Sequence, residues 1–296
     1  MMETVVVEKK VPQASAYRND TLKLLAFVTM LVDHIGYMFF PNEILFRIIG
    51  RLAFPIFAYQ IALGYSRTSN LKKYVLRLSL FALITQIPYS FFNPDIQFNL
   101  IHFNVLFTFI VAIGLIFVYD MGILKLKSFI KDKNYKHLLY GILLLALAVL
   151  IIILPEVLSF LIKDFYLEYG LLALALVLLF HIFQEKTEIA FISVILLYLL
   201  HGYYRVALWN SAYSSALFWS NLFNFKYVWS QLDLQNGFSQ LQRYYFNAWG
   251  IFALIPIFVL EILNKGWIRL NKYVGYVFYP AHMTLLIIIA IILKTY

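Results

Sequence analysis

The sequence has no cysteine among its 296 residues and carries little charge. The lack of thiols excludes disulfides, thiolate metal sites and an acyl intermediate on cysteine. Charged residues make up 13% of the chain, whereas soluble domains carry about 25%. Hydrophobic residues make up 62%. These proportions exclude an ordinary soluble domain and predict an all-α, polytopic bundle of transmembrane helices in a lipid bilayer.

Acidic residues are also scarce, with 15 Asp and Glu against 24 Lys and Arg, a formal net charge of +9. In a membrane protein such an excess reports the orientation of the loops, so nucleic acid is not expected as a partner. The first twenty residues are polar and lack the apolar core of a signal peptide. We therefore expect residues 1–20 to form a cytoplasmic tail and residues 21–296 to form a single transmembrane domain.

Apolar runs of about twenty residues are long enough to cross a bilayer as helices. The sequence predicts nine of them, at 21–40, 44–66, 71–92, 99–119, 138–156, 166–184, 188–209, 246–263 and 275–294. The aromatic stretch 210–245 has three interpretations: an interfacial helix, a re-entrant segment or a tenth span. Because Tyr and Trp favour the headgroup region, we expect an interfacial insertion on the outer side.

Lys and Arg are concentrated on one side of this predicted topology. With the N-terminus in the cytoplasm, most of them fall in inner segments, including 67–77 and 125–136. Positive residues favour cytoplasmic loops, so we expect a multi-pass protein of the cell membrane with a cytoplasmic N-terminus. The C-terminus would lie outside with nine spans and inside with ten.

Four ionisable residues lie inside the first two predicted helices: Asp33, His34, Arg47 and Arg51. A charge at the centre of a transmembrane helix costs about 2.5–3.5 kcal/mol on insertion scales, so such residues normally face a protein cavity. At about 1.5 Å of rise per residue, His34 and Arg51 lie about 9–10 Å from the outer ends of their helices. The sequence predicts either a polar site in the outer half of the bundle or a buried Asp–Arg pair that only fixes packing.

Other predicted helices carry polar residues three or four positions apart, which places them on shared faces. The members of this set are Gln86, Tyr89, Asn104, Thr108, Tyr279 and His282. They are expected to line the same site or to form hydrogen bonds between helices. The sequence shows no close set of His, Asp and Glu ligands, so no metal is predicted.

Several ordered motifs resemble those of the TraX family. They are DHIG from Asp33, RIIGR from Arg47 with FPIFA after it, KKYVLRL from Lys72, IPY, NVLFTF from Asn104, and FYPAH ending at His282. The resemblance covers most of residues 20–120 and 245–290. One departure is LEYG at 167–170, where Glu168 stands in place of the Asp in the family's Asp-Tyr-Gly.

The TraX family is named for a membrane protein required for N-acetylation of F-type conjugative pilin. This resemblance, with a more distant similarity to the acyltransferase-3 and heparan N-acetyltransferase families, implies a bacterial membrane acyltransferase that uses acetyl-CoA. The acceptor would be a small molecule or a peptide with an amine or hydroxyl group, such as a pilin-like N-terminus. The anionic donor is expected at the inner basic residues Arg67, Lys72, Lys73 and Arg77, although simple topology also accounts for them.

The polar residues suit that chemistry. A neutral His34 could act as a base or carry the acetyl group covalently. Arg47 and Arg51 could stabilise an oxyanion, while Asp33 could orient His34 or pair with an arginine. Two other function classes fit a polar site in the membrane: a non-enzymatic transporter or translocator, and a structural partner of a secretion or conjugation system. Broken helices in inverted repeats would favour the transporter, and none is evident in the sequence.

Overall fold

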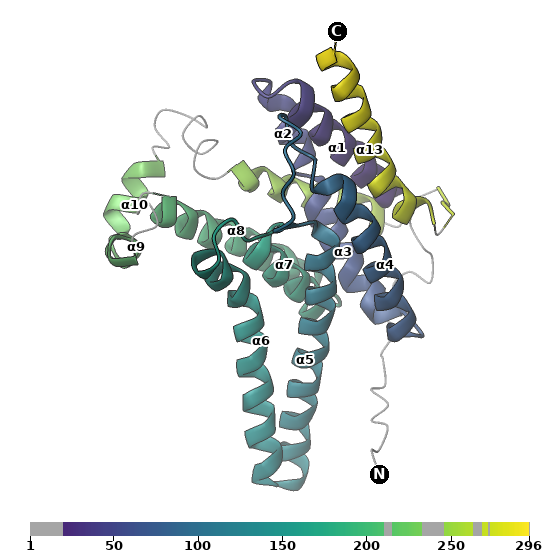
Figure 1. The fold of residues 1–296 in the computed structure, drawn as a ribbon. Helices are drawn as coiled ribbons and strands as arrows, with labels where there is room; N and C mark the ends of the chain where they lie inside the picture. Colours follow the sequence, from purple (N-terminus) through teal and green to yellow (C-terminus); the bar gives the residue numbers. More distant parts are fainter. Residues whose placement is uncertain (1–19, 210–214, 233–245, 263–267, 272, 296) are drawn as a thin grey trace.

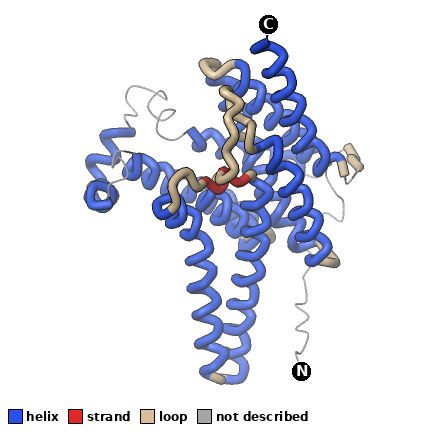
Figure 2. Tube along the Cα trace, in the orientation of Figure 1, coloured by secondary structure: helices blue, strands red, loops and turns tan. Residues whose placement is uncertain are grey.

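The computed structural model describes residues 20–209, 215–232, 246–262, 268–271 and 273–295, which are almost entirely helical (Figures 1 and 2). The elements are α1 (Asp20–Phe39), α2 (Ile44–Gly50), α3 (Ala53–Arg67), α4 (Leu71–Tyr89), β1 (His102–Phe103), α5 (Val105–Asp132), α6 (Tyr135–Leu161), β2 (Tyr166–Leu167), α7 (Gly170–Ile182), α8 (Thr187–Trp209), α9 (Ser215–Phe223), α10 (Phe225–Leu232), η2 (Phe246–Ala253), α12 (Leu254–Ile257), η3 (Phe258–Ile262) and α13 (Val274–Thr295). The predicted all-α bundle is confirmed. Of the tail predicted at 1–20, all but Asp20 lies outside the described residues.

Within the described chain, 6 helices are long and apolar enough to cross a membrane, with α2 and α3 counted together as 44–67. They match six of the nine predicted spans and make this a multi-pass membrane protein. Two further predictions fall on shorter apolar helices, Gly170–Ile182 and Asn247–Leu260. The remaining one, at 71–92, is α4, which is less apolar because its first two turns carry Lys72, Lys73 and Arg77.

α1 and α13 pack against each other and run in the same direction (Figure 1). Near their starts, Gly275 lies against Phe27, and farther along both helices His34 lies against His282. The start of α1 and the end of α13 are therefore at opposite ends of the bundle. The number of spans, nine or ten, stays a prediction.

α5 and α6 form a long hairpin that projects from the rest of the bundle (Figure 1). Asn104 and Asn134 cap the N-termini of the two helices, and Lys133 ends α5 in a left-handed conformation. Gly122 and Gly141 let the two backbones approach, because a Cβ at Gly141 would lie 3.2 Å from the Gly122 carbonyl oxygen. The helix expected at 99–119 thus runs from 105 to 132, and most of the lysines at 125–136 belong to its last turns.

Two predicted helix starts are wrong, and both lie near the centre of the fold. Helices were expected from residues 99 and 166, but α5 and α7 begin only at Val105 and Gly170. The segments before them are not helical, and β1 pairs in parallel with β2, His102 opposite Tyr166 (Figure 2). Non-helical backbone at membrane depth is tolerated only where protein buries it or where it lines a water-filled cavity. These two segments therefore mark the interior site.

The stretch predicted as an interfacial insertion, 210–245, contains two short helices, α9 and α10, of 9 and 8 residues. At about 1.5 Å per residue neither could cross a bilayer. Both pack on the second half of α8, where the Tyr203 hydroxyl donates to the Leu222 carbonyl at 2.6 Å and Val206 contacts Val228. Residues 210–214 and 233–245 lie outside the described part of the chain, so the interfacial position stays a prediction.

Candidate active site

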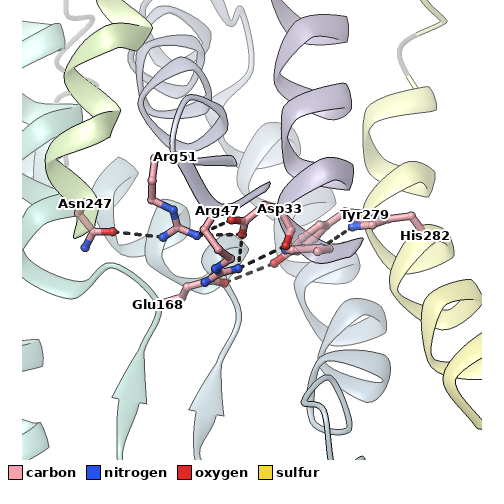
Figure 3. Close-up of polar contacts among 8 residues, drawn as sticks. Asp33, Arg47, Arg51, Glu168, Asn247, Tyr279 and His282 are labelled. Carbon is pink, nitrogen blue, oxygen red and sulfur yellow. Dashed lines mark hydrogen bonds and ion pairs between the residues drawn. The ribbon is translucent and has the colours of Figure 1, made fainter. Parts of the chain in front are cut away.

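Asp33 on α1 is the centre of a buried ion-pair cluster (Figure 3). Both of its carboxylate oxygens accept from Arg51 Nη2 at 2.8 Å, and Arg47 Nη1 lies 2.9 Å from Oδ2. The Asp33 and Arg51 side chains are only 9% and 10% exposed. Arg51 Nη1 also donates to Asn247 Oδ1 at 3.2 Å, which ties η2 to the cluster. Two guanidinium groups therefore share the Asp33 carboxylate inside the bundle.

The local sequence of α2 creates this arrangement. Arg47 and Arg51 are four residues apart, so they lie on one face of the chain and reach the same carboxylate. Gly50 allows α2 to approach α1, because a Cβ at this position would lie 2.1 Å from the Asp33 Cβ. Of the two roles considered for Asp33, the structure shows pairing with the arginines.

His34 and His282 form a hydrogen-bonded pair between α1 and α13. His34 Nδ1 lies 2.7 Å from His282 Nε2, and the ring planes are 12° apart. His282 Nδ1 lies 2.7 Å from the Phe278 carbonyl oxygen, which only accepts, so Nδ1 of His282 carries a proton. In a neutral His282, Nε2 is then an acceptor, and His34 Nδ1 must donate to it. The hydrogen-bond network thus assigns the lone pair of a neutral His34 to Nε2.

A cavity of about 680 Å³ joins the ion-pair cluster to His34 of the histidine pair. Asp33, His34, Arg47 and Arg51 all line it, so the four residues predicted as catalytic meet around one hollow. The rest of its wall is largely aromatic and polar, with Tyr37, Tyr89, Phe92, Phe98, Phe165 and Tyr166 among its members. Among the residues that the structure describes, no group of three or more His, Asp or Glu side chains is placed to hold a metal ion.

Glu168 is a second carboxylate at the site that the sequence-based set did not include. Its Oε2 accepts from the Val105 N–H at 2.9 Å. It also accepts from the Tyr279 hydroxyl at 3.4 Å (Figure 3). The following residue, Tyr169, has φ +62° and stacks on Phe54 with ring centroids 3.8 Å apart. The signal for Glu168 was the LEYG motif, whereas nothing in the sequence singled out Asn247.

The other predicted polar residues have different positions. Gln86, Asn104 and Thr108 are buried and bond inside the protein: Asn104 Nδ2 donates to Gln86 Oε1 at 2.8 Å, and Thr108 Oγ1 donates to the Glu168 carbonyl at 2.8 Å. This is the interhelical hydrogen bonding that was one of the two expectations for them. Tyr89 lines the large cavity, while Tyr279 lines a small adjoining one with Asp33 and His34.

The four residues expected to bind the donor lie at the other end of the helices. All of them are exposed, at the end of α3 and on the first turns of α4: Arg67, Lys72, Lys73 and Arg77. Only Arg77 of the four is among the residues that line a second cavity, of about 320 Å³. The structure therefore does not bring the set together as one site.

Residues 18–290 match the sequence model of the family described as TraX protein. The chain belongs to the TraX family. The match covers nearly the whole chain, including the motifs of α1 and α2 that line the cavity and the α13 motif that ends at His282. The more distant similarity to the acyltransferase-3 and heparan N-acetyltransferase families stays a prediction.

Two curated proteins are similar to parts of this TraX-family chain. A probable fimbrial assembly protein FimC, serogroup H1, of Dichelobacter nodosus is 33% identical over 104 residues, which are 31% of this chain and 42% of that protein. An uncharacterized protein of Rickettsia prowazekii (strain Madrid E) is 38% identical over 69 residues, 23% of this chain and 26% of that protein. The chain thus spans less than half the length of either relative. No solved structure matches it.

Proposed function

We propose that this protein is an integral membrane acetyltransferase that moves the acetyl group of acetyl-CoA to an amine or hydroxyl acceptor. The observation that carries the proposal is that His34 and two guanidinium groups line one cavity, with Nε2 of His34 left as the basic nitrogen. Acyl transfer needs a base for the nucleophile and positive charge for the oxyanion. We also propose that the end where α1 begins is cytoplasmic, since residues 67–77 and 125–136 place their Lys and Arg there.

His34 acts as the general base in this mechanism. Its Nε2 takes a proton from the acceptor nitrogen or oxygen as that atom attacks the carbonyl carbon of the thioester. The imidazolium that results still donates from Nδ1 to His282, and a hydrogen bond from a charged donor is stronger than one from a neutral donor. His282 is thus a positioning residue, which fixes the tautomer of His34 through the Phe278 carbonyl. General base catalysis of this kind contributes about 10²–10⁴-fold to the rate.

Arg47 and Arg51 stabilise the tetrahedral intermediate. Each guanidinium carries five N–H donors in a planar fork, and both groups line the cavity beside Asp33. Removal of one such donor costs about 2.7–4 kcal/mol in other oxyanion sites. When the intermediate collapses, the C–S bond breaks and the thiolate of CoA takes the proton from His34. The products are the acetylated acceptor and free CoA, and His34 is neutral again.

The shape and lining of the cavity favour the end of a peptide as acceptor. Its volume of about 680 Å³ is in the range of sites that hold a few residues or a small molecule. Aromatic rings on its wall can pack against apolar side chains, and its polar groups can bind backbone amides. The relative from Dichelobacter nodosus is named as a probable fimbrial assembly protein. A pilus subunit with a free N-terminal amine is therefore the acceptor that we propose.

The test is acetyl transfer by the purified protein in detergent. A peptide with a free N-terminal amine is incubated with acetyl-CoA, and the mass increase of one acetyl group is followed, with an N-terminally blocked peptide as control. His282→Gln keeps an acceptor oxygen for His34 Nδ1 and should retain part of the activity, whereas His282→Leu should lose it. Equal activity of the two variants would contradict the role of His282, and no transfer to any amine or hydroxyl acceptor would contradict the proposed function.

A further inference from the structure

A second cavity lies at the opposite end of the helices that carry His34 and His282. It has a volume of about 320 Å³ and is lined by the first turns of α1, α4, α5 and α13 and by later turns of α3. α1, α3, α4 and α13 lie together in the compact part of the bundle (Figure 1). The cavity is therefore on the side where α1 begins, away from the proposed acceptor site.

Positive charge and apolar surface are separated within this second cavity. Lys23 and Arg77 line it, and Lys23 is held by Asp20 at 3.8 Å. Two cations against one carboxylate leave the cavity positive. Deeper in, the wall is formed by aromatic and aliphatic side chains, with Phe27, Phe57, Ile61, Leu78 and Phe109 among them. Such a cavity suits a molecule with an anionic head and a slender, less polar arm.

A small third cavity, of about 30 Å³, lies between the two large ones. It shares Asp33 and His34 with the acceptor cavity and shares Phe57 with the second cavity. Phe57 packs against Phe27 with ring centroids 5.7 Å apart, so these two rings close the route between the cavities. From Lys23 to His34 the distance along α1 is about 17 Å at 1.5 Å per residue. The arm of a phosphorylated thioester is long and thin enough to follow such a route.

We infer that the second cavity is the binding site of the thioester donor, with the phosphates at Lys23 and Arg77 and the acyl end directed past Phe57 toward His34. This inference rests on the proposed function and deepens it, because it gives donor and acceptor separate entrances at opposite ends of the bundle. Lys23 was not among the residues expected to bind the donor. Arg67, Lys72 and Lys73 have no part in this site.

The absence of cysteine allows a direct test in the full-length protein. Single cysteines are introduced at Gln60 or Ile61, which line the second cavity, at Gln97, which lines the acceptor cavity, and at Ser128 on α5. The rate of maleimide labelling is measured with and without acetyl-CoA, whose sulfur is blocked as a thioester. Acetyl-CoA should slow the labelling of Gln60→Cys and Ile61→Cys at least tenfold and leave Gln97→Cys and Ser128→Cys unchanged.

Three results would overturn the inference. One is equal labelling of Gln60→Cys and Ile61→Cys with and without acetyl-CoA in protein that still transfers acetyl groups. A second is protection by detergent-solubilised phosphatidic acid but not by acetyl-CoA, which would make the cavity a lipid site. A third is protection of Gln97→Cys alone. Protection of Gln60→Cys by acetyl-CoA without acetyl transfer to any acceptor would instead support the donor site and contradict the proposed function. A failure of the inference is therefore distinguishable from a failure of the proposed function.

Kinetics give a second readout for the phosphate contacts. Arg77→Gln should raise KM for acetyl-CoA about three- to tenfold with little change in kcat, because loss of a charge-assisted contact weakens binding of the phosphates. The same variant should leave KM for acetyl-pantetheine unchanged, since that donor lacks phosphates. Lys127→Gln, an exposed lysine on α5 toward the same end, is the matched control and should leave both constants unchanged. An equal effect of Arg77→Gln on both donors would contradict the placement of the phosphates.

Discussion

Replacement of Gly50 by alanine tests whether the close approach of α2 to α1 is what holds the charged cluster together. A Cβ at Gly50 would lie 2.1 Å from Asp33 Cβ and 2.2 Å from its Oδ1. Carbon atoms pack at about 3.5–4.0 Å, so the helices or the Asp33 side chain must move by more than about 1 Å. A shift of this size would carry the Asp33 oxygens, now 2.8–2.9 Å from the two guanidinium groups, beyond hydrogen-bonding distance.

The expected cost follows from two terms. Overpacking of a core costs about 1–3 kcal/mol, and the loss of a buried ion pair costs about 3–5 kcal/mol when its partners are left behind. Because the structure can relax in part, we expect Gly50→Ala to lower the free energy of unfolding by about 2–4 kcal/mol. Activity should fall about 100-fold in the protein that remains folded, as a misplacement of 1 Å does in other active sites.

The assay compares Gly50→Ala with Gly114→Ala on α5. A Cβ at Gly114 meets no atom within 4 Å, and alanine favours helix by about 1 kcal/mol, so this control should be as stable as the wild type or more stable. Thermal unfolding in detergent and the rate of acetyl transfer are measured for both. A Gly50→Ala protein with wild-type stability and activity would refute the reasoning, because Asp33 could not then be held by the approach of α2.

Two further variants test other parts of the account by thermal unfolding in detergent. Asp33→Asn should destabilise the protein by about 3–5 kcal/mol, since the buried Arg51 and the partly exposed Arg47 lose their counter-ion. Asp132→Asn at the exposed end of α5 should change stability by less than about 1 kcal/mol. Equal effects would contradict the buried cluster. Asn104→Ala should lower the free energy of unfolding more than Asn134→Ala. Both variants lose a helix cap worth about 1 kcal/mol, but only Asn104 also bonds to Gln86. The reverse order would contradict the role of Asn104 in joining α4 to α5.

Much of the helical architecture could be predicted from the sequence because hydropathy is a strong signal in a membrane protein. Charged residues in apolar runs likewise predicted the cluster. A charged side chain such as Asp33 or Arg51 is costly in contact with lipid, so it is expected to face the interior of the bundle. The same signal failed where the chain is apolar but not helical. Residues 99–104 and 166–169 resemble helix ends in composition. Their non-helical conformation depends on tertiary contacts such as the hydrogen bond from Asn104 to Gln86.

The organisation of the site depended on contacts that the sequence does not reveal. His34 and His282 are 248 positions apart, and although each lies in a recognisable motif, no spacing rule pairs them. Asn247 reaches Arg51 from a segment with no polar pattern of its own. The donor set was predicted from charge alone, and charge does not distinguish a residue that binds a ligand from one that only orients the protein.

The most direct test of the central claim is the rate of acetyl transfer by purified His34→Gln protein. His181→Gln is the matched control, because His181 is also partly buried and bonded, to Asp120 at 2.8 Å, but lies away from the cavity. If His34 is the base, its replacement should lower kcat at least about 100-fold while the control keeps the wild-type rate. Transfer by His34→Gln at the rate of the control would contradict the account.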